Sequence, residues 1–137
     1  MADYLLDTDH VIGLVGDEDA VVNRLQRSAK AGDRFSICSA TLSELYWFAK
    51  STAQMALNTA ALTELVAELR VWDVDRAAAE IVGEILSEQR ALGQPVPRAV
   101  AEVAAIARQG QLVVLSSDPN FGLVRDITVE DWRAAGR

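Results

Sequence analysis

Three acidic residues at distant points of the chain have the type and the placement to do chemistry together. Asp7 and Asp118 each come just after a short apolar run that predicts a buried β-strand. Glu44 lies at the start of the helix that follows another such strand. In an open parallel sheet, side chains just past the carboxyl ends of the strands line the crevice where ligands bind. Carboxylates gathered there repel one another, and a hard divalent cation removes that repulsion. Oxygen ligands suit Mg²⁺ or Mn²⁺, which activate water and stabilise charge on a phosphoryl oxygen, so the pattern favours phosphodiester hydrolysis.

Each of these acids also has a purely structural interpretation. Asp7 precedes a predicted helix, and aspartate is among the best N-cap residues. Glu44 lies three residues after Thr41, which is the spacing of a capping box. Asp118 precedes a proline, a pair that is common in turns. Spacing alone leaves both interpretations open for each residue.

The single histidine, His10, follows the first acid closely. Because no cysteine or serine nucleophile accompanies it, the sequence favours a residue in the first turn of a helix over a catalytic base or a metal ligand. The chain carries no zinc-ligand spacing, no phosphate-binding glycine loop and no dinucleotide fingerprint. The acids are therefore the strongest chemical signal in the chain.

Short apolar strands alternate with longer amphipathic helices along the chain. Strands separated by helices of ten residues or more need crossover connections, so the order predicts an α/β fold with a parallel sheet covered on both faces. The clearest loop spans 93–97, where two prolines and a glycine forbid continued helix. Strands are predicted at 4–6, 34–38, 71–72 and 112–115, and helices from Thr8 or Asp9 and over 18–31, 42–50, 54–70, 73–91 and 99–109, with Ser39 or Thr41 capping the third.

Length and charge bound the function further. The chain of 137 residues is enough for one core, so residues 1–137 are expected to form a single domain. A net charge of −7 repels phosphate chains, which means that any contact with nucleic acid must come from a local site. The only cysteine, Cys38, lies in an apolar run and is expected to be a buried thiol in a reducing cytoplasm. The N-terminus is acidic where a signal peptide is basic, and no apolar stretch is long enough to cross a membrane.

Several motifs in register resemble those of the PIN-domain family, specifically the VapC-type ribonuclease toxins of bacterial toxin–antitoxin pairs. Residues 4–9 resemble the family's opening strand and its Asp-Thr-Asp/Asn signature, and 41–45 its Thr-x-x-Glu-Leu helix start. Residues 115–121 resemble its Leu-Thr-x-Asp-x-Asp-Phe stretch. The segments 93–96, 103–105 and 129–132 fall in the family's order and spacing, so the resemblance spans nearly the whole chain.

The resemblance implies a fold, an activity and partners. The fold is a three-layer α/β/α sandwich with a central, mainly parallel sheet. The activity is that of a Mg²⁺- or Mn²⁺-dependent endoribonuclease, which acts as a cytoplasmic homodimer and is inhibited by a small VapB-type antitoxin. By this resemblance Asp7, Glu44 and Asp118 are the catalytic and metal-site acids, and Asp9 supports the first of them.

One position departs from the family pattern. The pattern places an acid three residues before the segment 103–105, where this chain has Val100, and a further acid often found two residues earlier is replaced by Arg98. Glu102 is the nearest acid, but two residues along a helix is a rotation of about 200°, which is expected to turn it away. The Arg98 guanidinium could instead bind an RNA phosphate. Asn120 replaces a second, less critical aspartate.

The departure leaves two functions open. The chain is either a VapC-like ribonuclease, with its site impaired by the missing acid, or an inactive PIN-like module that acts through RNA or protein binding. A third reading, a phosphate-receiving signalling domain, has a candidate acceptor in Asp73 but lacks a lysine after the last predicted strand, where Ser116, Ser117 and Asp118 stand. The sequence therefore disfavours that third function.

Overall fold

Five short strands form one sheet with the order β3-β2-β1-β4-β5, and every neighbouring pair is parallel. The computed structural model describes residues 1–51 and 55–133. The strands are β1 (Asp3–Leu6), β2 (Arg34–Cys38), β3 (Arg70–Trp72), β4 (Val113–Leu115) and β5 (Thr128–Glu130). The helices are α1 (Thr8–Val15), α2 (Asp19–Lys30), α3 (Ser39–Lys50), α4 (Met55–Ala67), α5 (Arg76–Ala91) and α6 (Arg98–Gly110), with a 3₁₀ turn η1 (Pro119–Leu123).

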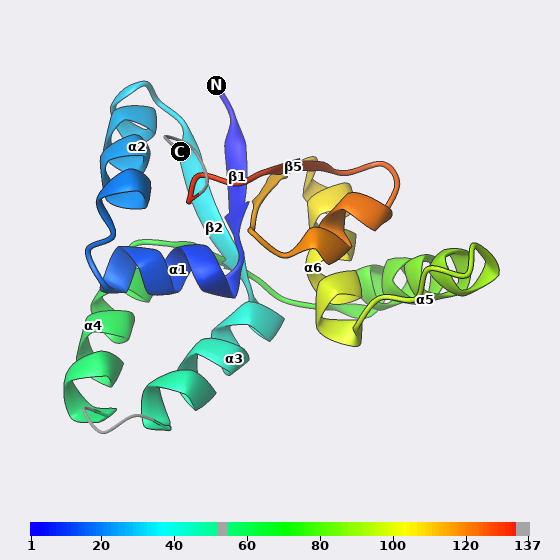
Figure 1. The fold of residues 1–137 in the computed structure, drawn as a ribbon, viewed down its shortest axis with the longest axis horizontal. Helices are drawn as coiled ribbons and strands as arrows, with labels where there is room; N and C mark the ends of the chain where they lie inside the picture. The colour runs from blue at the N-terminus through cyan, green and yellow to red at the C-terminus, as the bar shows by residue number, and fades with distance from the viewer. Residues whose placement is uncertain (52–54, 134–137) are drawn as a thin grey trace.

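Helices cover both faces of this sheet. Successive residues of a strand point to opposite faces, so Leu5 packs in one core and Leu6 in the other. The first core lies against α5 and α6, and the second lies against α1, α3 and α4 (Figure 1). Both leucines have no exposed surface. The predicted α/β fold with a parallel sheet between two helical layers is therefore confirmed.

The predicted elements are present, and the differences lie at their ends. Asp75 caps α5, since its carboxylate accepts a hydrogen bond from the backbone N–H of Ala78 at 2.9 Å. Helix α3 begins at Ser39, three residues before the predicted start of the helix proper. Helix α4 and strand β3 share the predicted 54–72 segment, of which residue 54 lies outside the described residues. Strand β5 was not predicted, because three residues between loops carry too weak an alternation to stand out.

The carboxyl ends of β1, β2 and β4 meet at one edge of the sheet. Leu6 is in register with Ile37 of β2 on one side and with Leu115 of β4 on the other. The chain beyond β1 stays on this edge, because the backbone N–H of Asp7 donates to the carbonyl of Leu115 at 3.0 Å. The segments that follow β1, β2 and β4 therefore start side by side. Among the described residues, no helix combines the length and the apolar character needed to span a bilayer.

Candidate active site

Asp7 is the most buried of the predicted site acids. It occupies the N-cap position of α1, as the structural interpretation predicts. Its carboxylate makes no capping hydrogen bond, however, so helix capping does not explain the side chain. The Ser116 hydroxyl donates to its Oδ2 at 2.8 Å. Burial raises the pKa of Asp7 to about 6, the hydrogen bonds from Ser116 and the Thr8 backbone lower it, and the charges of Asp9 and Glu44 raise it.

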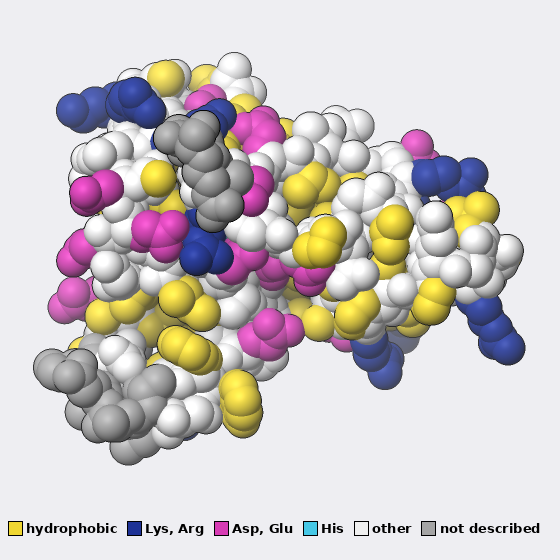
Figure 2. Space-filling model, in the orientation of Figure 1, with side chains coloured by type: hydrophobic (Ala, Val, Ile, Leu, Met, Phe, Trp, Pro, Cys, Tyr) yellow, Lys and Arg dark blue, Asp and Glu magenta, His cyan; other side chains and the backbone are white. Residues whose placement is uncertain are grey.

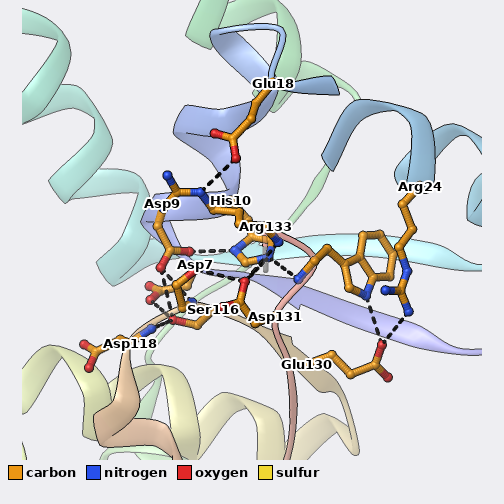
Figure 3. Close-up of polar contacts among 12 residues, drawn as sticks. Asp7, Asp9, His10, Glu18, Arg24, Ser116, Asp118, Glu130, Asp131 and Arg133 are labelled. Atoms are coloured by element: carbon orange, nitrogen blue, oxygen red, sulfur yellow. Dashed lines mark hydrogen bonds and ion pairs between the residues drawn. The ribbon is translucent and has the colours of Figure 1, made fainter. Parts of the chain in front are cut away.

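Ser116 joins Asp7 to the turn that carries Asp118. Its hydroxyl donates to Asp7 and accepts from the backbone N–H of Asp118 at 3.0 Å, while its side chain is almost fully buried. The Asp118 carboxylate in turn accepts from the backbone N–H of Asn120 at 2.9 Å. The predicted turn role of Asp118 is thus confirmed, and its backbone N–H contacts the same Ser116 hydroxyl that donates to Asp7 (Figure 3).

Glu44 reaches the same edge from α3. Its Oε2 accepts a hydrogen bond from the Thr8 hydroxyl at 2.9 Å, and its charge contributes to the raised pKa of Asp7. The predicted place of Glu44 in the first turn of the helix is wrong, because α3 begins at Ser39 with Cys38 as N-cap. No capping box forms for the same reason, and the buried Thr41 hydroxyl has no hydrogen-bond partner.

Asp9 supports the site from the first turn of α1. Its Oδ1 lies 2.7 Å from Nδ1 of His10, and its Oδ2 accepts from the backbone N–H of Ser117 at 2.8 Å. Burial raises the pKa of Asp9, but the hydrogen bonds from His10 and Ser117 and the charge of Arg133 outweigh it and hold the pKa below its usual value. Both oxygens are occupied, which suits a carboxylate that orients its neighbours.

Sequence reasoning missed two residues of this network, Ser116 and His10. Ser116 follows a strong strand signal directly, but a serine between a strand and an aspartate has no distinctive spacing. His10 lies in the first turn of α1, as predicted, yet it is fully buried and hydrogen-bonded at both ring nitrogens. Its second partner is the backbone N–H of Trp132, which is far away in the sequence, so no local pattern indicates the contact.

The acids fit a hard divalent cation, although they are not preassembled around one. Within residues 1–51 and 55–133, no three aspartate, glutamate, histidine or cysteine side chains are arranged to hold an ion as they stand. The observation that favours a cation is the buried Asp7 carboxylate, whose pKa lies well above its usual value beside two like charges. The side chains that contact it or act on it by charge, Ser116, Asp9 and Glu44, carry oxygen atoms, which are the ligands that Mg²⁺ and Mn²⁺ prefer. A bound cation would lower the free-energy cost of ionising the Asp7 carboxyl group.

A comparison with protein families identifies the family of this chain. The PIN domain profile matches residues 4–127, which is most of the chain. The chain belongs to the PIN-domain family. It is 30% identical over 133 residues to the tRNA(fMet)-specific endonuclease VapC of Shigella flexneri, which covers 96% of this chain and 99% of that protein. It is 26% identical over 133 residues to ribonuclease VapC2 of Haemophilus influenzae, with the same coverage of both chains.

Solved structures agree with this family. The DNA-bound VapBC structure from Salmonella typhimurium contains a chain that is 28% identical, with a TM-score of 0.86, over 96% of this chain and 99% of that one. The DNA-bound VapBC2 structure from Rickettsia felis gives a TM-score of 0.87 at 20% identity, over 95% of this chain and 98% of that one, and supports the fold alone. This PIN-domain protein is thus VapC-like along its whole described length.

On the α6 side of the candidate site, an apolar residue and an ion pair take the place of free carboxylates. Val100 is 5% exposed and packs in the core between the sheet and the α5–α6 layer. The Arg98 side chain is 80% exposed and its Nε lies 3.3 Å from Oε1 of Glu102, one turn along the helix. Glu102 is only 23% exposed, and after burial its charge contributes to the raised pKa of the Cys38 thiol at the end of β2. Glu102 is paired with Arg98 one helical turn away.

Proposed function

We propose that this PIN-domain protein is the toxin of a type II toxin–antitoxin pair and acts as a Mg²⁺- or Mn²⁺-dependent endoribonuclease. The observation that carries the proposal is the buried Asp7 carboxylate, with its pKa raised to about 6 beside Asp9 and Glu44, at the crevice edge of the sheet. The full-length similarity to VapC ribonucleases supports it independently.

Each residue has a defined role in this proposal. Asp7, Glu44 and Asp118 would hold the cation, which when bound would supply an activated water and a positive charge for the phosphoryl oxygen. Ser116 orients Asp7 through its hydroxyl and the Asp118 turn through its lone pair. Arg98 is exposed on the rim, where its planar guanidinium can exchange Glu102 for an RNA phosphate.

The partners of the protein follow from its surface and its relatives. Figure 2 shows a band of acidic side chains across the middle of one face, so RNA must approach locally rather than through a general positive field. The relative from Shigella flexneri is named for tRNA(fMet), and we take tRNA as the first substrate to test. We expect the protein to be cytoplasmic and homodimeric.

An apolar surface on α3 supports a protein partner. Trp47 is 72% exposed and Phe48 is 42% exposed, and Phe48 lines a hollow of about 190 Å³ between α1, α3 and α4. Exposed aromatic side chains beside an apolar hollow are typical of a protein interface. We assign this surface to a small VapB-type antitoxin, by analogy with the VapBC complex that this fold resembles.

The test is cleavage of RNA by the purified chain. Initiator tRNA and a mixed tRNA pool are incubated with protein and Mg²⁺ or Mn²⁺, and the cleavage sites are mapped by sequencing. We expect cleavage that stops with a chelator and in Asp7→Asn. The control is Asp126→Asn, an exposed aspartate in a left-handed conformation that asparagine tolerates. Equal cleavage by wild type and Asp7→Asn, or none by the wild type with either ion, contradicts the proposal.

One observation favours a second function, an inactive PIN-like module. Val100 lies in an apolar core where the family resemblance implies an acid, and no three ligand side chains among the described residues are preassembled. Such a module would bind RNA or its antitoxin without cleaving RNA. The same assay decides, if a binding measurement accompanies it, because cleavage by the wild type excludes this function.

A further inference from the structure

His10 connects the end of the chain to the candidate site. The imidazole has no exposed surface and lies beside the Asp9 carboxylate (Figure 3), and its other nitrogen contacts the backbone of Trp132. Its Nδ1 lies 2.7 Å from Oδ1 of Asp9, and its Nε2 lies 3.0 Å from the backbone nitrogen of Trp132. One side chain therefore links the first turn of α1 to a residue 122 positions further along the chain.

The two contacts determine where the imidazole proton lies. A backbone N–H only donates, so Nε2 of His10 must accept from Trp132 and carry no proton. Nδ1 then carries the proton that is donated to Asp9, while Oδ1 of Asp131 lies 3.8 Å from Nε2, beyond hydrogen-bond distance. Each nitrogen has the role that its partner requires, and the ring cannot rotate without losing both hydrogen bonds.

The segment that His10 contacts is itself held firmly. We call residues 130–133 the C-terminal clasp. The Arg24 guanidinium lies 4.7 Å above the Trp132 ring, and Glu130 accepts from the Trp132 indole N–H at 2.9 Å. Arg133 pairs with Glu18 at 3.2 Å. The Trp132 side chain is 1% exposed, so the clasp is packed into the fold and provides a fixed support for His10.

Asp9 connects the His10 side chain to the residues around the site acids. The second oxygen of Asp9 accepts from the backbone N–H of Ser117, and so holds the turn after β4. The preceding Ser116 donates to Asp7 and accepts from the backbone of Asp118. Figure 3 shows this continuous line from the clasp through His10 and Asp9 to Ser116.

We propose that His10 is a positioning residue for the nuclease site, which it orients by fixing Asp9 between the C-terminal clasp and the turn at Ser116 and Ser117. The inference rests on the proposed function, because it assigns a role in that reaction. The backbone N–H of His10 donates to the Asp7 carbonyl at 3.2 Å in the first turn of α1, but the described contacts of the imidazole include no hydrogen bond to Asp7 or Asp118, so the ring acts through Asp9. Its loss is expected to lower kcat while leaving KM for RNA nearly unchanged, because RNA binding uses other groups.

The first test is spectroscopic and needs no activity. Because the chain has one histidine, a long-range ¹H–¹⁵N spectrum of the full-length protein reports His10 without assignment. We expect a protonated Nδ1 and a bare Nε2 at neutral pH. A proton on Nε2, or averaging between the two tautomers, overturns the proposal.

The second test compares three variants in the tRNA cleavage assay. His10→Leu fills the space but removes both hydrogen bonds, and we expect kcat to fall about 30-fold. His10→Gln keeps one donor and one acceptor on an amide, and we expect it to recover at least part of that loss. Val11→Ala, a buried neighbour on α1, is the control that loses packing without losing this link, and its kcat should stay within about twofold of wild type.

The outcomes distinguish failure of the nuclease function from failure of the positioning role of His10. If wild type shows no metal-dependent cleavage, the proposed function fails, whatever the tautomer is. If wild type cleaves RNA but His10→Leu matches Val11→Ala in kcat, or His10→Gln shows no recovery, the positioning role fails while the function stands. If His10→Leu does not fold, the tautomer and the kcat of His10→Gln still decide, because a Gln variant with less than a tenth of wild-type kcat contradicts the proposal.

Discussion

The two sides of the candidate site differ in polarity: one is a hydrogen-bonded network of acids, and the other is mainly apolar. On the α1 side, Asp7, Asp9 and Ser116 form a partly buried hydrogen-bonded network, which continues through His10 to the C-terminal clasp. On the α6 side, Val100 packs into an apolar core, and the charges of Arg98 and Glu102 neutralise each other at the rim. Negative charge is therefore concentrated on one side of the crevice.

This difference shows where the site is constrained and where it can change. Carboxylates on the α1 side are held by several partners each, so a substitution there disturbs a network. The α6 side contributes apolar packing and one exposed arginine, so a substitution there adds or removes a single interaction. The two sides should consequently respond to mutation by different amounts.

The largest expected effect separates two glutamates on opposite sides. Glu44→Gln removes a charge that faces Asp7, and we expect RNA cleavage to fall by about 1000-fold because the cation loses a ligand. Glu102→Gln, on α6, should change cleavage by less than about threefold. Both are measured as kcat/KM on tRNA. Comparable losses in the two variants would mean that α6 supplies a ligand after all.

The next effect is the contribution of Asp7 to the dependence of stability on pH. Its pKa is about 6 in the folded protein against 3.8 in the unfolded chain, so the folded state binds the proton more tightly. The stabilisation is complete below pH 3.8 and is lost as the pH rises through 6, which amounts to about 3 kcal/mol.

Urea unfolding without added metal measures this effect. Asp7→Asn cannot ionise, so its stability relative to wild type should increase by about 3 kcal/mol between pH 4 and pH 7.5. Adding Mn²⁺ at pH 7.5 should reduce the difference, because the ion binds only the wild type tightly. A stability difference that stays constant with pH would show that folding does not raise the pKa of Asp7.

A smaller effect is expected when the α6 side is made to resemble the α1 side. Val100→Asp places a carboxylate in the apolar core, and we expect a loss of about 2 kcal/mol in metal-free stability, moderated by the helix N-terminus nearby. Mn²⁺ affinity should rise about tenfold, as measured by calorimetry, because a fourth carboxylate becomes available.

Val100→Asn is the matched control, since it has the same shape without the charge. It should lose similar stability and gain no Mn²⁺ affinity. If both variants bind Mn²⁺ as wild type does, position 100 does not face the cation. If Val100→Asp cleaves RNA and the wild type does not, the inactive-module function is the correct one.

The smallest effect concerns the exposed arginine. Arg98→Ala should leave stability within about 0.5 kcal/mol of wild type, because an exposed ion pair one helical turn apart contributes little. We expect KM for tRNA to rise about threefold with kcat unchanged, measured at low salt where phosphate contacts are strongest. Arg76→Ala, an exposed arginine at the start of α5, is the control. An equal rise in both would assign the effect to net charge.

The parts of the site that could be predicted were those with a local signature. Asp7 and Asp118 follow strands, and parallel strands bring their carboxyl ends to the same edge whatever the details of packing. Glu44 was assigned to the correct helix but to the wrong turn, because the start of α3 depends on how Cys38 packs at the end of β2 and not on a strong capping sequence.

Composition and periodicity in the sequence by themselves determined the α/β class, the parallel sheet and the acids at its edge, because hydrophobic period and strand order act through neighbouring residues. Only the tertiary structure decided that His10 joins Asp9 to Trp132 and that Ser116 lies between Asp7 and the turn of Asp118. These contacts join segments that are distant in sequence, and their geometry is set by how whole helices pack on the sheet, which no short pattern encodes.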